Sequence, residues 1–98
     1  MAYAFTEEIN RLFRAILTLQ TEEECRCFFD DLCTIKELQD LSQRLEVAVM
    51  LSEGKNYQEV SRATGASTAT ICRVNKCLNY GNQGYTTVLN RINKKEEQ

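Results

Sequence analysis

The stretch that decides the fold is 56–78, which reads Asn-Tyr-Gln-Glu-Val-Ser-Arg-Ala-Thr-Gly-Ala-Ser-Thr-Ala-Thr-Ile-Cys-Arg-Val-Asn-Lys-Cys-Leu. Asn56 with Glu59 forms a capping pair that predicts the start of a helix. Gly65 can take the positive φ of a sharp turn, and Ser67 can cap a second helix. In this register the residues that face the joint between the two helices are small or apolar: Val60, Ser61, Ile71, Val74 and Leu78. The stretch therefore predicts a helix-turn-helix.

The outward face of the second helix predicts contact with double-stranded DNA. At about 100° per residue this face carries small side chains near its N-terminus, which would let the helix enter a major groove. Arg73 and Lys76 would then reach phosphates, as would Gln58 at the start of the first helix. The predicted DNA-binding residues are Gln58, Arg62, Ser67, Thr68, Ala69, Thr70, Cys72, Arg73 and Lys76. A plain hairpin of two helices is the alternative interpretation.

Charge is divided unevenly along the chain, although the formal net charge is only −2. Residues 1–53 carry five Lys/Arg against eleven Asp/Glu, whereas residues 54–98 carry seven against three. Only the surface that meets phosphate has to be positive. The acidic first half is therefore compatible with DNA binding by the second half.

The rest of the chain predicts an all-α fold in a single domain. Pro is absent, all four Gly lie after residue 53, and no alternating run indicates a strand. Capping pairs at Thr21 and Thr34, together with apolar spacing, predict helices over 5–19, 22–32 and 35–53. After a linker at 79–84 we expect a short helix over 85–92 and a frayed tail at 93–98. Residues 1–53 would form a dimerisation core, 54–80 the helix-turn-helix, and 81–98 the linker, short helix and charged tail.

The segment 45–51, Leu-Glu-Val-Ala-Val-Met-Leu, is apolar almost all round a helix and must be covered on several sides. A 98-residue chain has few other helices to cover it. We therefore predict a homodimer built on the N-terminal helices. A monomer with one central helix is the alternative.

Composition argues against several other classes of protein. The chain has no His, no Gly-rich phosphate loop and no nucleophile triad, so we predict neither an enzyme nor a bound cofactor. Five Cys without a secretory signal or a long apolar run predict reduced thiols in a cytoplasmic protein, with no metal site and no membrane partner. Cys25 and Cys27 would lie on roughly opposite sides of a helix, so a buried, inert role is favoured for them over a zinc site. The rival function is a protein-interaction module that uses the same helices to bind another regulator or RNA polymerase.

The run Thr-Gly-Ala-Ser-Thr-Ala-Thr-Ile-Cys-Arg at 64–73, preceded by Gly54 and Gln-Glu-Val at 58–60, resembles the Trp repressor superfamily. The layout is most similar to the YerC/YecD-type TrpR-related proteins. This resemblance implies an intertwined homodimer that binds DNA and regulates transcription, usually as a repressor. It also implies that the residues matching Thr68, Ala69 and Cys72 approach bases.

The resemblance also implies a possible effector pocket formed by Arg44, Arg73, Val74 and Cys77. Arg44 and Arg73 match the two arginines that hold L-tryptophan in the repressor, although a salt bridge to a surface carboxylate is an alternative role for Arg44. Val74 replaces a Gly and would crowd an indole, and Cys77 replaces a Ser and hydrogen-bonds weakly. We therefore predict that tryptophan is not the effector and that any effector is unknown.

Overall fold

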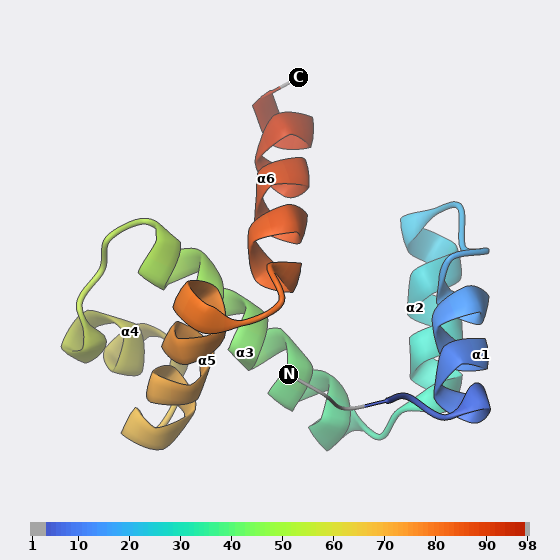
Figure 1. Ribbon diagram of the computed structural model, residues 1–98, viewed down its shortest axis with the longest axis horizontal. Helices are drawn as coiled ribbons and strands as arrows, with labels where there is room; N and C mark the ends of the chain where they lie inside the picture. The colour runs from blue at the N-terminus through green and yellow to red at the C-terminus, as the bar shows by residue number, and fades with distance from the viewer. Residues whose placement is uncertain (1–3, 98) are drawn as a thin grey trace. The chain divides into compact units, whose positions relative to one another are not determined.

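The structure, a computed structural model, describes residues 4–97 as six α-helices without a strand (Figure 1). The helices are α1 (Glu7–Ile16), α2 (Glu22–Leu32), α3 (Ile35–Ser52), α4 (Tyr57–Thr64), α5 (Thr68–Tyr80) and α6 (Gly84–Glu97). The predicted all-α fold is confirmed. None of these helices, over the residues described, is both long and apolar enough to cross a membrane.

The chain divides into two compact units, with the boundary between Leu38 and Gln39. The N-terminal unit holds α1, α2 and the first turn of α3, at residues 35–38. The C-terminal unit holds the remainder of α3 together with α4, α5 and α6.

In the N-terminal unit, α1 is shorter than the predicted helix over 5–19. It begins at Glu7 because the Thr6 hydroxyl accepts a hydrogen bond from the Ile9 backbone N–H at 3.2 Å, which is an N-cap. It ends at Ile16, and the Thr18 hydroxyl then donates to the Ala15 carbonyl at 2.7 Å. This side-chain bond competes with continuation of the helix, which the apolar spacing alone could not reveal.

The predicted helices α2 and α3 are confirmed to within one residue. At the start of α3, Thr34 and Glu37 form the expected capping box, with hydrogen bonds of 2.8 and 3.1 Å. At the start of α2, Thr21 caps the Glu24 backbone N–H, but the Glu24 carboxylate accepts from Gln20 instead of completing the box.

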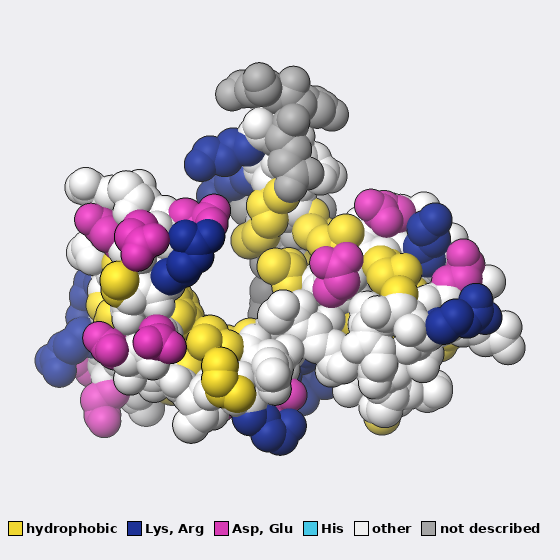
Figure 2. All heavy atoms as spheres, turned by 180° about the vertical axis from the view of Figure 1, so that it is seen from behind, with side chains coloured by type: hydrophobic (Ala, Val, Ile, Leu, Met, Phe, Trp, Pro, Cys, Tyr) yellow, Lys and Arg dark blue, Asp and Glu magenta, His cyan; other side chains and the backbone are white. Residues whose placement is uncertain are grey.

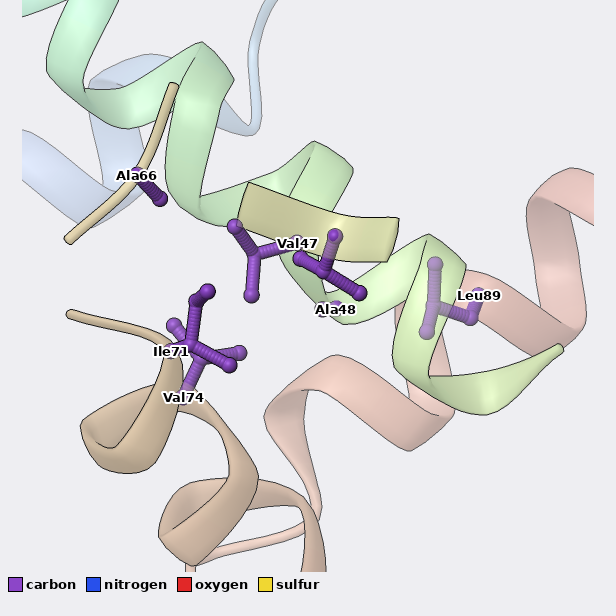
Figure 3. Packing of buried hydrophobic residues seen from close by; sticks show 7 residues of the cluster. Val47, Ala48, Ala66, Ile71, Val74 and Leu89 are labelled. Carbon is purple, nitrogen blue, oxygen red and sulfur yellow. The ribbon is translucent and has the colours of Figure 1, made fainter. Parts of the chain in front are cut away.

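The C-terminal unit contains a small hydrophobic core, shown in Figure 3. Its side chains come from α3, α4, the turn after α4, α5 and α6, and the buried residues are Val47, Ala48, Val60, Ala66, Ile71, Val74 and Leu89. Val47 and Ala48 lie in the segment 45–51, and their complete burial agrees with its apolar character. Partly buried Leu51, Leu78 and Tyr85 pack around this core.

After α5 the chain differs from the prediction. Helix α5 continues to Tyr80, so the connection to α6 is only 81–83 and not 79–84. Gln83 in this connection has a φ of +69°. The last helix spans Gly84–Glu97 and not 85–92, so residues 93–97 are helical and the predicted frayed tail is wrong for them. Residue 98 lies outside the described residues.

The prediction that Cys25 and Cys27 are buried is wrong, because both are exposed. Cys72 is exposed, as expected for the outward face of α5, while Cys77 is also exposed and Cys33 is half-buried. Figure 2 shows hydrophobic side chains among the charged ones on one face of the molecule. The exposed large hydrophobic residues include Phe13, Leu17, Leu32, Leu45 and Val88. A single chain therefore leaves much apolar surface in contact with water.

Candidate nucleic-acid interface

The first helix of the predicted helix-turn-helix, α4, begins at a complete capping box. The Asn56 side chain accepts from the Glu59 backbone N–H at 2.9 Å, and the Glu59 carboxylate accepts from the Asn56 N–H at 3.1 Å. Val60, one turn into α4, is fully buried, as predicted.

The turn after α4 is fixed by backbone geometry and by hydroxyl groups. Gly65 has a φ of +74°, and its N–H donates to the Ser61 carbonyl at 2.8 Å, which ends the helix as predicted. Ser61, at the joint between the two helices, also fixes the turn, because its hydroxyl donates to the Ala66 carbonyl at 3.1 Å. The Gln43 side chain also donates to the Thr64 carbonyl at 3.1 Å, so α3 holds the end of α4.

The second helix, α5, begins at Ser67, whose side chain accepts from the Thr70 backbone N–H. Its inward side carries Ile71 and Val74, each about 1 % exposed, and half-buried Leu78. Figure 3 shows Ile71 and Val74 on the core side of this helix. The predicted inward register of α5 is confirmed.

The opposite side of α5 is open to water. Seven of the residues predicted to bind DNA lie on α5 or its cap, and six of them are exposed: Ser67, Thr68, Ala69, Cys72, Arg73 and Lys76. The seventh, Thr70, is half-buried, and its hydroxyl accepts from the Ser67 hydroxyl at 3.2 Å. Thr70 therefore stabilises the N-cap of α5, and its hydroxyl is less accessible to a ligand than the six exposed side chains.

The remaining two predicted residues, Gln58 and Arg62, are exposed on α4. They line a polar hollow together with Tyr57, Ser61 and Thr68, so the start of α4 and the start of α5 share one surface. Lys55, Arg62, Arg73 and Lys76 give the segment 55–80 four positive charges. The opposing carboxylate, Glu59, is engaged in the capping box.

Tyr57 is a member of this surface that the sequence analysis did not single out. Its side chain is 37 % exposed. The pKa of its phenol is raised by desolvation and by the Cys72 thiol, both through charge and through a hydrogen bond, while a hydrogen bond from Asn75 acts in the opposite direction. Tyr57 and Cys72 are 15 positions apart, so a pattern with the period of one helix could not reveal this effect on the phenol.

The four residues of the predicted effector pocket have different surroundings. Val74 is buried in the core, Arg44 is half-buried and Arg73 is exposed. Cys77 lines an apolar hollow with Leu45, Tyr85, Val88 and the connection after α5. Within the described residues no carboxylate lies at ion-pair distance from Arg44, so its alternative role as a surface salt bridge is not formed in this chain.

Among the residues that the structure describes, no group of three or more His, Cys, Asp or Glu side chains lies close enough to hold a metal ion.

The arrangement of α4 and α5 is that of a helix-turn-helix, the two-helix unit of many DNA-binding proteins. The sequence profile of the Trp repressor protein family matches residues 7–93. The chain therefore belongs to the Trp repressor family, whose members are DNA-binding regulators rather than enzymes.

Relatives of known sequence or structure agree with this assignment. The YerC protein of Bacillus subtilis (strain 168) is 55 % identical over 92 residues, which cover 94 % of this chain and 88 % of YerC. A crystal structure of a candidate Trp repressor from Staphylococcus aureus has a TM-score of 0.86 and 52 % identity, over 91 % of this chain and 89 % of that one. A TrpR-like protein from Eubacterium eligens ATCC 27750 has a TM-score of 0.85 and 52 % identity, over 90 % and 91 % of the two chains. The predicted resemblance is confirmed.

Proposed function

We propose that this protein is a sequence-specific DNA-binding regulator of transcription that acts as a homodimer, most simply as a repressor that occupies promoter DNA. The observation that carries the proposal is the division of α5. One side is fixed in the core by Ile71 and Val74, and the other presents Ala69, Arg73 and Lys76 to solvent. A helix held in this way can enter the major groove without disturbing the fold. Such a regulator works beside the chromosome, in the cytoplasm.

The roles of the exposed residues follow from their chemistry. Arg73, Lys76 and Arg62 would bind phosphates, and the side chain and backbone N–H of Gln58 at the start of α4 would do the same. Thr68, Ala69 and Cys72 would face base edges, where they offer few bidentate hydrogen bonds. Recognition would therefore depend on thymine methyl groups, water and DNA shape.

The dimer is supported by the exposed apolar surface of the single chain. In the N-terminal unit no described residue is buried, and α1 and α2 have only 10 and 11 residues. Helices of this length are marginal on their own in water. A second copy would cover Phe13, Leu17 and Leu32, and each large side chain that becomes buried contributes about 1.5–3 kcal/mol.

We also propose that L-tryptophan is not the effector. Val74 fills space in the core and Cys77 offers only a weak hydrogen-bonding group. Titration calorimetry should show no stoichiometric binding of L-tryptophan at micromolar concentration. A saturable micromolar isotherm would overturn this part of the proposal.

DNA binding is tested by fluorescence anisotropy with a labelled mixed-sequence duplex between 50 and 200 mM salt, a range chosen because phosphate contacts change affinity steeply there. We expect affinity to fall with salt, and the double variant Arg73→Ala/Lys76→Ala to reduce the slope of log K against log salt by about 2. The matched control is Arg91→Ala/Lys94→Ala, which changes the net charge equally on exposed positions of α6. If both double variants behave alike, α5 is not the docking helix. If the wild-type protein shows no salt-dependent binding, the protein-interaction module is favoured instead.

A further inference from the structure

The Gln43 side chain connects α3 to the turn of the helix-turn-helix. Its amide nitrogen, Nε2, donates to the Thr64 carbonyl oxygen at 3.1 Å, and the bond is partly buried. Thr64 is the last residue of α4, so its carbonyl is one of those that a helix leaves without an internal partner at its C-terminus. Both residues line one polar hollow together with Gln39, Ser42 and Glu46. The bond therefore joins two helices across 21 positions of the sequence and satisfies the end of α4.

The turn that receives this bond is itself held by hydroxyl groups. The Thr64 Oγ1 donates to the Val60 carbonyl at 2.7 Å and accepts from the Ala66 backbone N–H at 3.1 Å. The Ser61 hydroxyl donates to the Ala66 carbonyl at 3.1 Å. Ala66 is buried on the turn between the two helices (Figure 3), and the next residue, Ser67, is the N-cap of α5. A restraint on this turn is therefore passed to the start of α5 with little freedom between them.

The hydrophobic contacts of the same region are less able to fix a direction. Val47 on α3 belongs to the same core cluster as Ile71 and Val74 on α5. Burial of apolar surface favours this packing but is non-directional, whereas a hydrogen bond weakens steeply when its angle changes. The Gln43 bond therefore adds a directional restraint to packing that apolar side chains hold together.

The orientation of α5 on α3 matters because α3 also takes part in the N-terminal unit. Residues 35–38 of this helix belong to that unit, which a second copy would cover in the proposed dimer. In a dimer, the orientation of each reading helix on the dimerising part determines the distance and rotation between the two reading helices. These determine which spacing between the two halves of a DNA site can be bound.

We propose that Gln43 is a positioning residue of the DNA interface, which acts through the Thr64 carbonyl to fix α5 on α3 and so restricts the half-site spacing that the dimer accepts. The inference rests on the proposed function, in both its DNA-binding and its dimer part. It implies that Gln43 affects discrimination between spacings more than affinity for DNA in general.

The first test examines the bond in the free protein, without DNA. In a proton–nitrogen correlation spectrum, the side-chain amide signals of Gln43 are those lost in Gln43→Met, and the signals of Gln39 are those lost in Gln39→Met. Gln39 is the matched control, because it is an exposed glutamine one turn earlier on α3 that borders the same hollow. The bonded Gln43 proton should exchange with water about 2- to 10-fold more slowly than the Gln39 protons. Equal exchange rates would overturn the contact and with it the inference.

The second test measures discrimination between spacings by fluorescence anisotropy. The tightest-binding fragment selected from genomic DNA is compared with the same fragment carrying one base pair inserted at its centre, which moves one half by about 3.4 Å and rotates it by about 34°. Wild type should bind the altered fragment about 10-fold more weakly, or worse. In Gln43→Met this ratio of affinities should fall by about 2- to 10-fold, because one directional restraint per chain is lost. Gln39→Met should keep the wild-type ratio, and neither variant should change the affinity for mixed-sequence DNA.

The possible outcomes separate the two claims. If wild type binds no DNA, the proposed function fails and the inference fails with it. If wild type discriminates between the two fragments and Gln43→Met does so equally well, only the positioning role fails. That role also fails if wild type binds both fragments equally, or if Gln43→Met loses the same affinity on every DNA. Urea denaturation of Gln43→Met shows whether a change in binding comes from loss of the fold.

Discussion

The two units of this protein are built from equally well-defined helices but differ in what their helices bury. In the N-terminal unit α1 and α2 are capped by Thr6 and Thr21, as α4 and α5 are capped by Asn56 and Ser67 in the C-terminal unit. All seven described buried residues nevertheless belong to the C-terminal unit. Local hydrogen bonding therefore defines where helices start in both units, whereas a core within one chain exists in only one of them.

This difference indicates which unit can be stable within a single chain. Hydrophobic burial is the dominant favourable contribution to folding, and helix caps contribute only about 1 kcal/mol each. The C-terminal unit has both contributions. The N-terminal unit has caps and surface ion pairs, such as Arg26 with Glu22, which add little. We infer that it acquires its burial from a second copy of the chain.

The largest expected effect is a cavity in the core of the C-terminal unit. Ile71→Ala should lower the free energy of unfolding by about 2–5 kcal/mol, because Ile71 is 1 % exposed and the space it leaves cannot be refilled. Urea denaturation followed by circular dichroism measures the change. Lys76→Ala on the outward side of the same helix is the control and should stay within about 0.5 kcal/mol. Equal effects of the two substitutions would contradict the division of α5.

The next effect tests the N-terminal unit. Leu17 is 83 % exposed in one chain, so in a monomer Leu17→Ser would change stability by less than about 0.5 kcal/mol. If a second copy covers Leu17, the loss should be about 1.5–3 kcal/mol, and the unfolding midpoint of wild type should rise with protein concentration. Leu17→Met, which keeps the hydrophobic contact, is the control. A concentration-independent midpoint together with a neutral Leu17→Ser would refute the dimer.

Loss of an N-cap should lower the free energy of unfolding of the unit that contains it by about 1 kcal/mol, whichever unit that is. Asn56→Ala should lower the free energy of unfolding by that amount at every protein concentration. Thr21→Ala should do so only at concentrations where the dimer is populated, because α2 has no core of its own in one chain. Denaturation at two concentrations distinguishes these cases. A Thr21→Ala effect that is independent of concentration would show that the N-terminal unit is stable within the monomer.

The smallest effect concerns the connection between α5 and α6. Gln83 has a φ of +69°, a conformation that costs an L-residue with a side chain about 1–2 kcal/mol. Gln83→Gly removes this strain but adds freedom to the unfolded chain, so we expect a net gain of about 0.5 kcal/mol. Thermal unfolding measures it, with Gln83→Ala as the control that keeps the strain. A glycine variant no more stable than the alanine variant would show that the strain is not significant.

The sequence predicted those parts of the fold that depend on neighbouring residues. The capping box of Asn56 and Glu59, the turn at Gly65 and the inward positions of Ile71 and Val74 all follow from short spacings, and all are confirmed. The apolar spacing extends the predicted first helix beyond the observed end of α1, because the Thr18 hydroxyl competes with the helix there. The predicted last helix is too short because residues 93–97 are polar or charged and continue no apolar spacing.

The candidate site was also predictable only in part, because some of its features depend on residues far apart in the sequence. Exposure of Arg73 and Lys76 follows from the helical period once Ile71 is placed in the core. The effect of Cys72 on the pKa of the Tyr57 phenol depends on how α4 crosses α5, and the exposure of Cys25 and Cys27 depends on how little core the N-terminal unit forms within one chain. Neither property is encoded in a local pattern. The DNA-binding roles and the dimer remain predictions.

The two-sided character of α5 also has a consequence for how this family can diverge. Ala69, Arg73 and Lys76 contribute nothing to the core, whereas Ile71 and Val74 are fully committed to it. Mutations at the first three positions can therefore accumulate with little penalty in stability. In the DNA-binding role proposed above, a change at Ala69 would alter the preferred sequence, and changes at Arg73 or Lys76 would alter the affinity for DNA. A duplicated gene of this kind could acquire a new set of target promoters through a few substitutions on one helix face while it inherits the scaffold unaltered.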